Sequence, residues 1–202
     1  MRASLCLCRG AALVALAAMA TAGCTPTPVP TRFYVLSTSP PPGGVPTAPP
    51  ADFAVGVGPI TIPAYLDRPQ IVTRTGQDEV DLAEFDQWGE PLRPAVQRVL
   101  AEDLALRIPT QRVILFPWRG TRSVQYQVAV EILRFEGQPG GDVVLQARWR
   151  LLDGAGRELL LRTSPLTEAT GAPGYPAMVA ALSRALGALS GEIAAAIASV
   201  VR

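Results

Sequence analysis

The residue types that most often carry out catalysis are scarce in this sequence. It contains no histidine, and its three cysteines, Cys6, Cys8 and Cys24, all lie near the amino terminus. Without imidazole, a Ser/His/Asp triad, a Cys/His pair or an HExxH zinc site cannot form. Downstream of Cys24 the chain also lacks the thiols needed for a disulfide or a thiolate metal site. The sequence therefore predicts a protein without catalytic residues, cofactor or bound metal.

Carboxylates are the remaining candidates for acid–base chemistry. Four glutamates fall on or beside predicted strands: Glu131, Glu136, Glu158 and Glu168. Two of them could cleave a glycosidic bond if their carboxylates lay about 5 to 10 Å apart. Their spacing gives no sign of such a pair. We expect solvated side chains at strand edges, with Arg148 and Arg150 as cross-strand partners.

Cys24 points to a different chemistry. Arg2 and Arg9 form a basic region at the start of the chain, residues 11–20 form an uncharged apolar region, and the small residues Thr21-Ala22-Gly23 precede the cysteine. This is the layout of a secretory signal. The tetrapeptide 21–24 resembles a bacterial lipobox, in which the cysteine thiol receives diacylglycerol before cleavage. We expect residues 1–23 to be a signal peptide and the mature protein to begin at a Cys24 carrying acyl chains of the palmitate type. The alternatives are an ordinary cleaved signal that contains a cysteine, or a Cys24 that is a buried free thiol.

The residue after the cysteine bears on where the protein is sorted. It is Thr25. By resemblance to the sorting rule of enterobacterial lipoproteins, the lack of Asp there favours the outer membrane, with the protein lipid-anchored on the periplasmic face.

Charge and composition exclude two further classes. The chain has 18 basic and 17 acidic residues and a formal net charge of +1, without the basic excess of a nucleic-acid-binding domain. It is 49% hydrophobic and 17% charged, too apolar for an intrinsically disordered chain. We therefore expect a folded protein with no nucleic-acid partner.

The hydrophobic pattern predicts an α+β fold. Residues 24–31 form a Pro-rich tether after the lipidated cysteine. Strands are expected at 32–37, 53–62, 70–74 and 80–83, followed by an antiparallel meander at 124–132, 145–151 and 157–163. Helical spacing predicts helices at 92–108 and 175–201. Together they form one domain, 32–202: a mostly antiparallel sheet with two amphipathic helices packed on one face. Trp149 lies on the apolar side of its strand and is expected in the core.

The last helix is apolar enough to raise the question of a membrane span. Arg184 and Glu192 interrupt its apolar run, which leaves no uncharged stretch of the roughly 18 to 20 residues that a span needs. We expect this helix to pack on the sheet.

Two segments make the chain recognisable: Tyr65–Arg74, which reads Tyr-Leu-Asp-Arg-Pro-Gln-Ile-Val-Thr-Arg, and Phe85–Leu92, which reads Phe-Asp-Gln-Trp-Gly-Glu-Pro-Leu. With Tyr34-Val35-Leu36 and the Val-x-x-x-Pro-Trp element at 113–118, they resemble the auxiliary lipoproteins of ABC-type transport systems, the PqiC/YmbA-like family. The resemblance runs in the same order along the whole mature chain. One departure is Asp103, where the family pattern has Asn.

The resemblance implies a partner role without catalysis. Such lipoproteins accompany mammalian-cell-entry (MCE) domain proteins in lipid transport between the inner and outer membranes, which supports envelope integrity. An MCE-domain protein is thus the expected partner, and symmetry matching to a ring-shaped partner would make this chain a homo-oligomer. A stand-alone periplasmic lipid-binding or outer-membrane assembly lipoprotein is the alternative, and it predicts an apolar cavity between sheet and helices.

The residues expected to dock a partner come from these segments. Tyr and Arg are favoured anchors of protein interfaces. The candidates are Tyr65, Leu66, Asp67, Arg68, Trp88 and Trp118. The simpler interpretation of the first segment, which we favour, is a turn at Asp67 and Arg68 stabilised by local hydrogen bonds, with Pro69 imposing extended geometry on Arg68. This interpretation is compatible with docking.

Overall fold

A computed structural model describes residues 29–44, 51–118 and 124–201, so the predicted signal peptide and Cys24 lie outside the described residues. We describe the unit Thr31–Arg202 by itself. Its strands are β1 (Arg32–Tyr34), β2 (Ala54–Thr61), β3 (Gln70–Arg74), β4 (Val80–Trp88), β5 (Arg112–Leu115), β6 (Tyr126–Gly137), β7 (Asp142–Asp153) and β8 (Glu158–Ala169). Its helices are α2 (Leu92–Ala105) and α3 (Tyr175–Val200).

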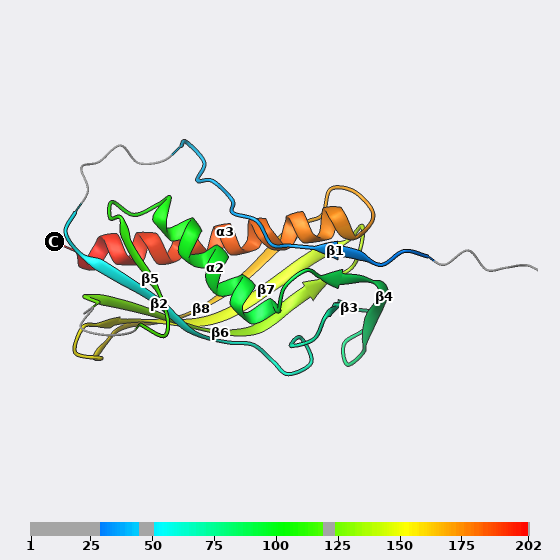
Figure 1. Ribbon diagram of the computed structural model, residues 1–202, viewed down its shortest axis with the longest axis horizontal. Coiled ribbons are helices and arrows are strands. Elements are labelled where there is room, and N and C mark those ends of the chain that lie inside the picture. The colour runs from blue at the N-terminus through cyan, green and yellow to red at the C-terminus, as the bar shows by residue number, and fades with distance from the viewer. Residues whose placement is uncertain (1–28, 45–50, 119–123, 202) are drawn as a thin grey trace, which may run out of the picture. The chain divides into compact units, whose positions relative to one another are not determined.

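All of these strands belong to one sheet, in which β6 is the central member (Figure 1). One edge of β6 pairs with β7 along its length, and β7 pairs with β8. The other edge pairs first with β2 and, at its far end, with β3. Strand β4 joins β3 to β1, while β5 lies outside β2. The predicted meander is confirmed as β6–β7–β8.

The sheet is mixed, so the expectation of a mostly antiparallel sheet was wrong. The pairs β1–β4, β2–β5, β2–β6 and β3–β6 are parallel. Only β3–β4, β6–β7 and β7–β8 are antiparallel among the described strands. Each antiparallel pair is joined by a turn, whereas the parallel pairs are separated by helix α2 or by long excursions, as parallel crossovers require.

Both helices pack on the same side of the sheet (Figure 1), which confirms the α+β class. Helix α3 lies over β6, β7 and β8, and α2 lies over β2 and β5. By length and composition α3 could cross a membrane, but 67% of its most apolar window is buried inside the protein. Trp149 is fully buried, as predicted, and its indole Nε1 donates to the Ser164 hydroxyl at 3.0 Å.

A register shift within β6 controls which side chains reach the outer face of the sheet. Up to Ile132 the even-numbered residues of β6 face the helices, and the pairing with β7 then slips between Ile132 and Arg134. Because side chains alternate along a strand, a slip of one residue reverses the faces. Arg134 and Glu136 therefore lie on the side opposite the core residue Phe135.

The loop between β2 and β3 fills a gap along β6. Strand β2 leaves β6 at Thr61, opposite Glu131, and β3 returns to it at Thr73, opposite Gly137. The first recognisable segment begins in this loop. The loop therefore runs past the stretch of β6 that carries Arg134 and Glu136.

Candidate functional site

Three of the segments singled out in the sequence meet at one place. The backbone N–H of Trp88 donates to the carbonyl of Pro69 at 2.7 Å, and the N–H of Gly89 donates to the carbonyl of Tyr34 at 2.7 Å. Strand β1 runs parallel to the end of β4, which pairs Tyr34 with Trp88. The sheet thus brings together stretches of chain that are far apart in sequence.

Where the two longest segments touch, they enclose a surface pocket of about 290 Å³. Its lining residues come only from these segments: Asp67, Arg68 and Pro69 from one, and Trp88, Gly89, Glu90, Pro91 and Leu92 from the other. We call it the motif pocket. It combines charged groups at its rim with apolar and proline surface, a composition suited to contacting another protein.

The predicted docking residues occupy different positions around this pocket. Leu66 and Trp88 are buried in the core, with 1% and 7% of their surface exposed, so they support the loop from beneath. Asp67 is exposed and forms an ion pair of 2.9 Å with Arg93, in the first turn of α2. Arg68 is half-buried, and its Nε has no hydrogen-bond partner among the described residues. Asp67 and Arg68 are therefore the ones that present polar groups to the pocket.

Tyr65 fixes the loop to the sheet through a buried carboxylate. Its hydroxyl donates to Glu136 at 2.9 Å, and Glu136 also accepts hydrogen bonds from Arg74 Nε at 2.8 Å and Arg134 Nε at 3.0 Å. The N–H of Phe135 adds a further bond of 2.9 Å. Because the Glu136 side chain is 0% exposed, these donors replace the water it lost.

The ionisation of this cluster follows from its geometry. Burial alone would raise the pKa of Glu136, but the hydrogen bonds from Arg74, Arg134, the Phe135 N–H and Tyr65 outweigh it, and the pKa lies below its ordinary value. Burial, followed by the hydrogen bond to Glu136, raises the pKa of Tyr65 to about 12. At neutral pH a carboxylate is thus held by two guanidinium groups and a neutral phenol.

Glu136 corrects one expectation from the sequence, because it is not a solvated strand-edge residue. Glu131 and Glu158 are exposed, as expected, and Glu168 is half-buried. The prediction failed for Glu136 because the register shift in β6 places this residue beneath the β2–β3 loop, which buries it. The only hint in the sequence is that strict alternation along β6 would place two charged residues, Arg134 and Glu136, in the core. A break in the alternation before Arg134 avoids this.

Trp118 lies away from the motif pocket, beside β2. Its ring packs edge-on against Phe116, with centroids 5.2 Å apart, and it covers Gly56 so closely that a Cβ there would be 2.5 Å from the indole. Gln97 on α2 donates to the carbonyls of Val57 and Phe116 at 2.9 and 2.7 Å. Arg93, which pairs with Asp67 at the motif pocket, lies one helical turn before Gln97. A single side of α2 therefore contacts both the motif pocket and the region around Trp118.

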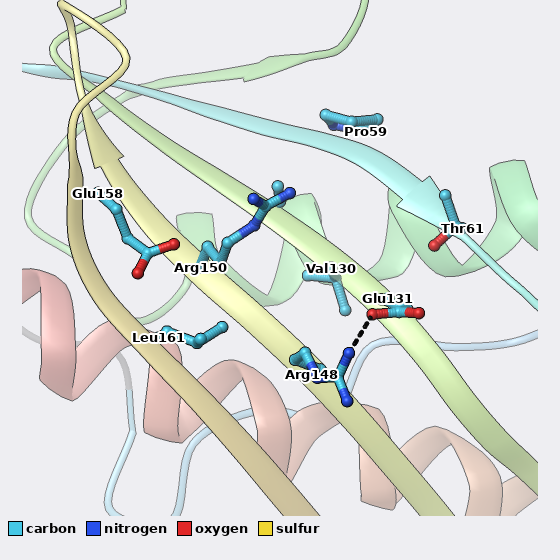
Figure 2. Close-up of a pocket in the computed structure, with 9 residues that line it drawn as sticks. Pro59, Thr61, Val130, Glu131, Arg148, Arg150, Glu158 and Leu161 are labelled. Atoms are coloured by element: carbon cyan, nitrogen blue, oxygen red, sulfur yellow. Dashed lines mark hydrogen bonds and ion pairs between the residues drawn. The ribbon is translucent and has the colours of Figure 1, made fainter.

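A second pocket, of about 380 Å³, lies on the outer face of the sheet (Figure 2). Arg148 on β7 pairs with Glu131 on β6 at 3.3 Å, which confirms the expected cross-strand partner. Arg150 lies opposite Ala129 and Leu161 and so has no glutamate directly across from it. Both members of the Arg148–Glu131 pair are about half exposed, with 52% and 49% of their side chains accessible, so this is an ordinary surface ion pair.

Metal ligands do not cluster in the described part of the protein. Across residues 29–44, 51–118 and 124–201, no three His, Cys, Asp or Glu side chains gather in a way that could hold a metal ion.

Comparison with known families identifies the chain. Residues 34–194 match the family described as the ABC-type transport auxiliary lipoprotein component, and this range includes every segment that lines the motif pocket. The chain belongs to the ABC-type transport auxiliary lipoprotein family. The family resemblance seen in the sequence is thereby confirmed, and the protein is an auxiliary lipoprotein of a transport system.

Individual relatives of this auxiliary lipoprotein agree with the family match. It is 28% identical over 171 residues to the intermembrane transport lipoprotein PqiC of Escherichia coli (strain K12). The aligned region covers 85% of this chain and 88% of the relative. PqiC of Shigella flexneri matches to the same extent.

Two crystal structures share the fold of this auxiliary lipoprotein. One is of an uncharacterised protein, with a TM-score of 0.69 at 22% identity, covering 84% of this chain and 99% of that one. The other is of a Xanthomonas campestris protein, with a TM-score of 0.67 at 18% identity, covering 81% and 93%. At these identities they show the fold alone.

Proposed function

We propose that this auxiliary lipoprotein is a non-catalytic subunit that holds an MCE-domain protein of an ABC-type lipid transporter at the periplasmic face of the outer membrane. Acyl chains on Cys24 would anchor it there, and the MCE protein would dock at the motif pocket. In this role the protein would support the integrity of the envelope. It would also be a homo-oligomer if it matches the symmetry of a ring-shaped partner.

The observation that carries the proposal is the meeting of the recognisable segments in one surface pocket. The β-sheet and the Glu136 cluster fix this pocket, as expected of a preorganised binding site. The name of the Escherichia coli relative, an intermembrane transport lipoprotein, agrees with a role between membranes.

Within this proposal the candidate residues divide by exposure. Asp67 and Arg68 would touch the partner directly, because both line the pocket. Tyr65, Leu66 and Trp88 would act as positioning residues, since the sheet and the core hold them. Trp118, half-buried beside Phe116, would provide a second contact on the same side of α2.

The alternative of a stand-alone lipid carrier gains little from the fold. It predicted an apolar cavity between the sheet and the helices. In the described residues this space is filled by side chains that are 0 or 1% exposed: Leu100, Leu145, Trp149, Leu182 and Leu186. A bound acyl chain would have to displace this packed core.

Site-specific crosslinking in the native host tests the proposal. A photo-crosslinking amino acid at position 68, in the full-length protein, is expected to capture an MCE-domain protein that mass spectrometry identifies. The matched control places the same group at Leu161, which is 51% exposed on the outer face of the sheet, and should capture much less. Capture of the MCE protein from both positions alike, or from neither, would contradict docking at the motif pocket.

A substitution pair gives an independent test. Arg68→Ala is expected to reduce co-purification of the MCE protein by about tenfold or more, as for an interface arginine worth at least about 1.4 kcal/mol. Arg148→Ala removes an arginine from an exposed ion pair on the other face and should leave co-purification unchanged. Cys24→Ala should move the protein out of the outer-membrane fraction, whereas Arg68→Ala should not.

A further inference from the structure

Strand β1 and the residue that follows it expose two large apolar side chains. Phe33 is 66% exposed and Val35 is 55% exposed. Their neighbours Tyr34 and Leu36 point the other way: Leu36 is 1% exposed and Tyr34 packs against the core. Because side chains alternate in an extended chain, burying Tyr34 and Leu36 forces Phe33 and Val35 outward.

This arrangement is rigidly held. The carboxylate of Asp86 forms an ion pair with the guanidinium of Arg32 at 2.9 Å and accepts a hydrogen bond from the hydroxyl of Tyr34 at 2.7 Å. Farther along, the N–H of Ser37 donates to the Ser183 hydroxyl on α3 at 3.2 Å. Turning Phe33 and Val35 inward would break these bonds, so their exposure is built into the fold.

The two side chains form one surface together with Gly89. A Cβ on Gly89 would lie 3.2 Å from Val35 Cγ1 and 3.9 Å from Phe33 Cβ, so both flank this glycine. We call Phe33, Val35 and Gly89 the β1 patch. Exposed apolar side chains that lie next to one another in this way suit a contact with a protein or a membrane.

The length of chain before β1 identifies the occupant. From Cys24 to Phe33 the extended chain spans at most about 32 Å, at about 3.3 to 3.6 Å per residue. Two or three acyl chains on Cys24 would anchor the protein stably on the bilayer. With Cys24 acylated, this short connection would keep the β1 patch within reach of the bilayer surface, where an apolar patch is more favourably buried in lipid than exposed to water.

We propose that Phe33 and Val35 insert into the surface of the bilayer that holds Cys24, so that the folded domain itself contacts lipid beside its anchor. This inference rests on the acylation of Cys24 in the proposed function. Apolar burial drives the contact, because the charges near the patch would not attract an anionic membrane. Arg32 is neutralised by its ion pair with Asp86. Asp78 and Glu79, just before the neighbouring strand β4, and Asp81 within it are all acidic. Membrane insertion should therefore persist at high salt and without anionic lipid.

Fluorescent labelling of the full-length, acylated protein tests the contact. Beyond the predicted signal peptide, Cys24 is the only cysteine of the chain, so Phe33→Cys introduces a single free thiol for an environment-sensitive dye. In vesicles of phosphatidylethanolamine and phosphatidylglycerol, iodide in the water is expected to quench the dye at position 33 several-fold less than the same dye at Leu161→Cys. Leu161 is the matched control because it is 51% exposed on β8, at the opposite edge of the sheet from β1.

A second label guards against a dye that inserts on its own account. A dye at Thr31→Cys, beside the patch, is expected to be protected in the otherwise unchanged protein. It should become accessible when Phe33→Ser and Val35→Ser are added. Those two exposed side chains contribute little to the core, so the melting temperature should hardly change.

The outcomes separate this inference from the proposed function. Equal quenching at positions 33 and 161, in a protein that mass spectrometry shows to be acylated, would overturn the lipid contact and leave the anchor intact. Protection of position 33 only after an MCE-domain protein is added would also overturn it and assign the patch to that partner. A protein that is unacylated and does not sediment with vesicles would overturn both.

Discussion

The hydroxyl of Tyr65 binds the buried carboxylate of Glu136, 71 residues farther along the chain, at 2.9 Å. This bond ties the loop that lines the motif pocket to the central strand of the sheet. Arg74 and Arg134 complete the cage around the same carboxylate. The position of Asp67 and Arg68 thus depends on a charge cluster to which neither belongs.

Replacing the buried carboxylate should weaken the fold. Glu136→Gln is expected to lower the free energy of unfolding by about 2 to 3 kcal/mol at pH 7, because two guanidinium groups lose their charged partner. Urea unfolding measures this loss. Glu131→Gln is the control, since Glu131 forms a half-exposed ion pair, and it should change stability by less than about 1 kcal/mol.

The same residue should make stability depend on pH. The pKa of Glu136 in the folded protein lies below its ordinary value of 4.5. Its contribution is therefore complete above pH 4.5 and is lost as the pH falls through the folded-state pKa. In urea unfolding between pH 6 and pH 3, the wild-type protein should lose more stability than Glu136→Gln. Parallel curves for the two proteins would contradict the assignment.

Tyr65→Phe removes one hydrogen bond and keeps the ring. The expected cost is about 1 kcal/mol of unfolding free energy, the usual net value of such a bond. Because the pKa of Tyr65 is raised to about 12, ultraviolet titration of the wild-type protein should show a tyrosine that ionises only near pH 12. This last step should be missing in Tyr65→Phe, and its persistence would place the step on another tyrosine.

Gly56 leaves room for Trp118, and a methyl group there should displace the indole. The added Cβ would lie 2.5 Å from the ring. Gly56→Ala is therefore expected to destabilise the protein by about 1 to 3 kcal/mol and to change the tryptophan fluorescence. Gly191→Ala is the control, because a Cβ on that residue of α3 meets nothing within 4 Å. It should be neutral or stabilise by up to about 1 kcal/mol, as Ala does in a helix.

Asp103 holds the loop after β1 against α2. Its Oδ1 accepts the N–H of Ser39 at 2.9 Å and a bond from Arg107 at 3.2 Å. Burial raises the pKa of Asp103, against the opposing effects of Ser39 and Arg107. Asp103→Ala should cost about 3 kcal/mol, since the buried Arg107 loses its carboxylate partner and keeps only backbone carbonyls.

Asp103→Asn should cost less than the alanine variant, because the amide oxygen can still accept from Ser39. Thermal or urea unfolding of the two variants side by side gives the comparison. An asparagine variant as unstable as the alanine variant would show that only the charge matters at this site.

Much of the secondary structure could be predicted from the sequence. Period-two alternation placed β6, β7 and β8 and predicted that Trp149 is buried, and helical spacing placed α2 and α3. These features depend on neighbours a few positions apart, where the chain's own geometry decides which side chains share a face. The segments at 65–74 and 85–92 were also recognisable without a structure, as the family match confirms.

Strand direction and the burial of Glu136 were decided by the tertiary structure. Whether β2 pairs in parallel with β6 depends on where α2 carries the chain, and the fate of Glu136 depends on one slipped position in β6. Likewise, the pocket at Arg68 exists because Trp88 binds Pro69 across two strands. Local sequence patterns specify which face of a segment is apolar, but the contacts that pair distant segments form only when all the apolar faces are buried together.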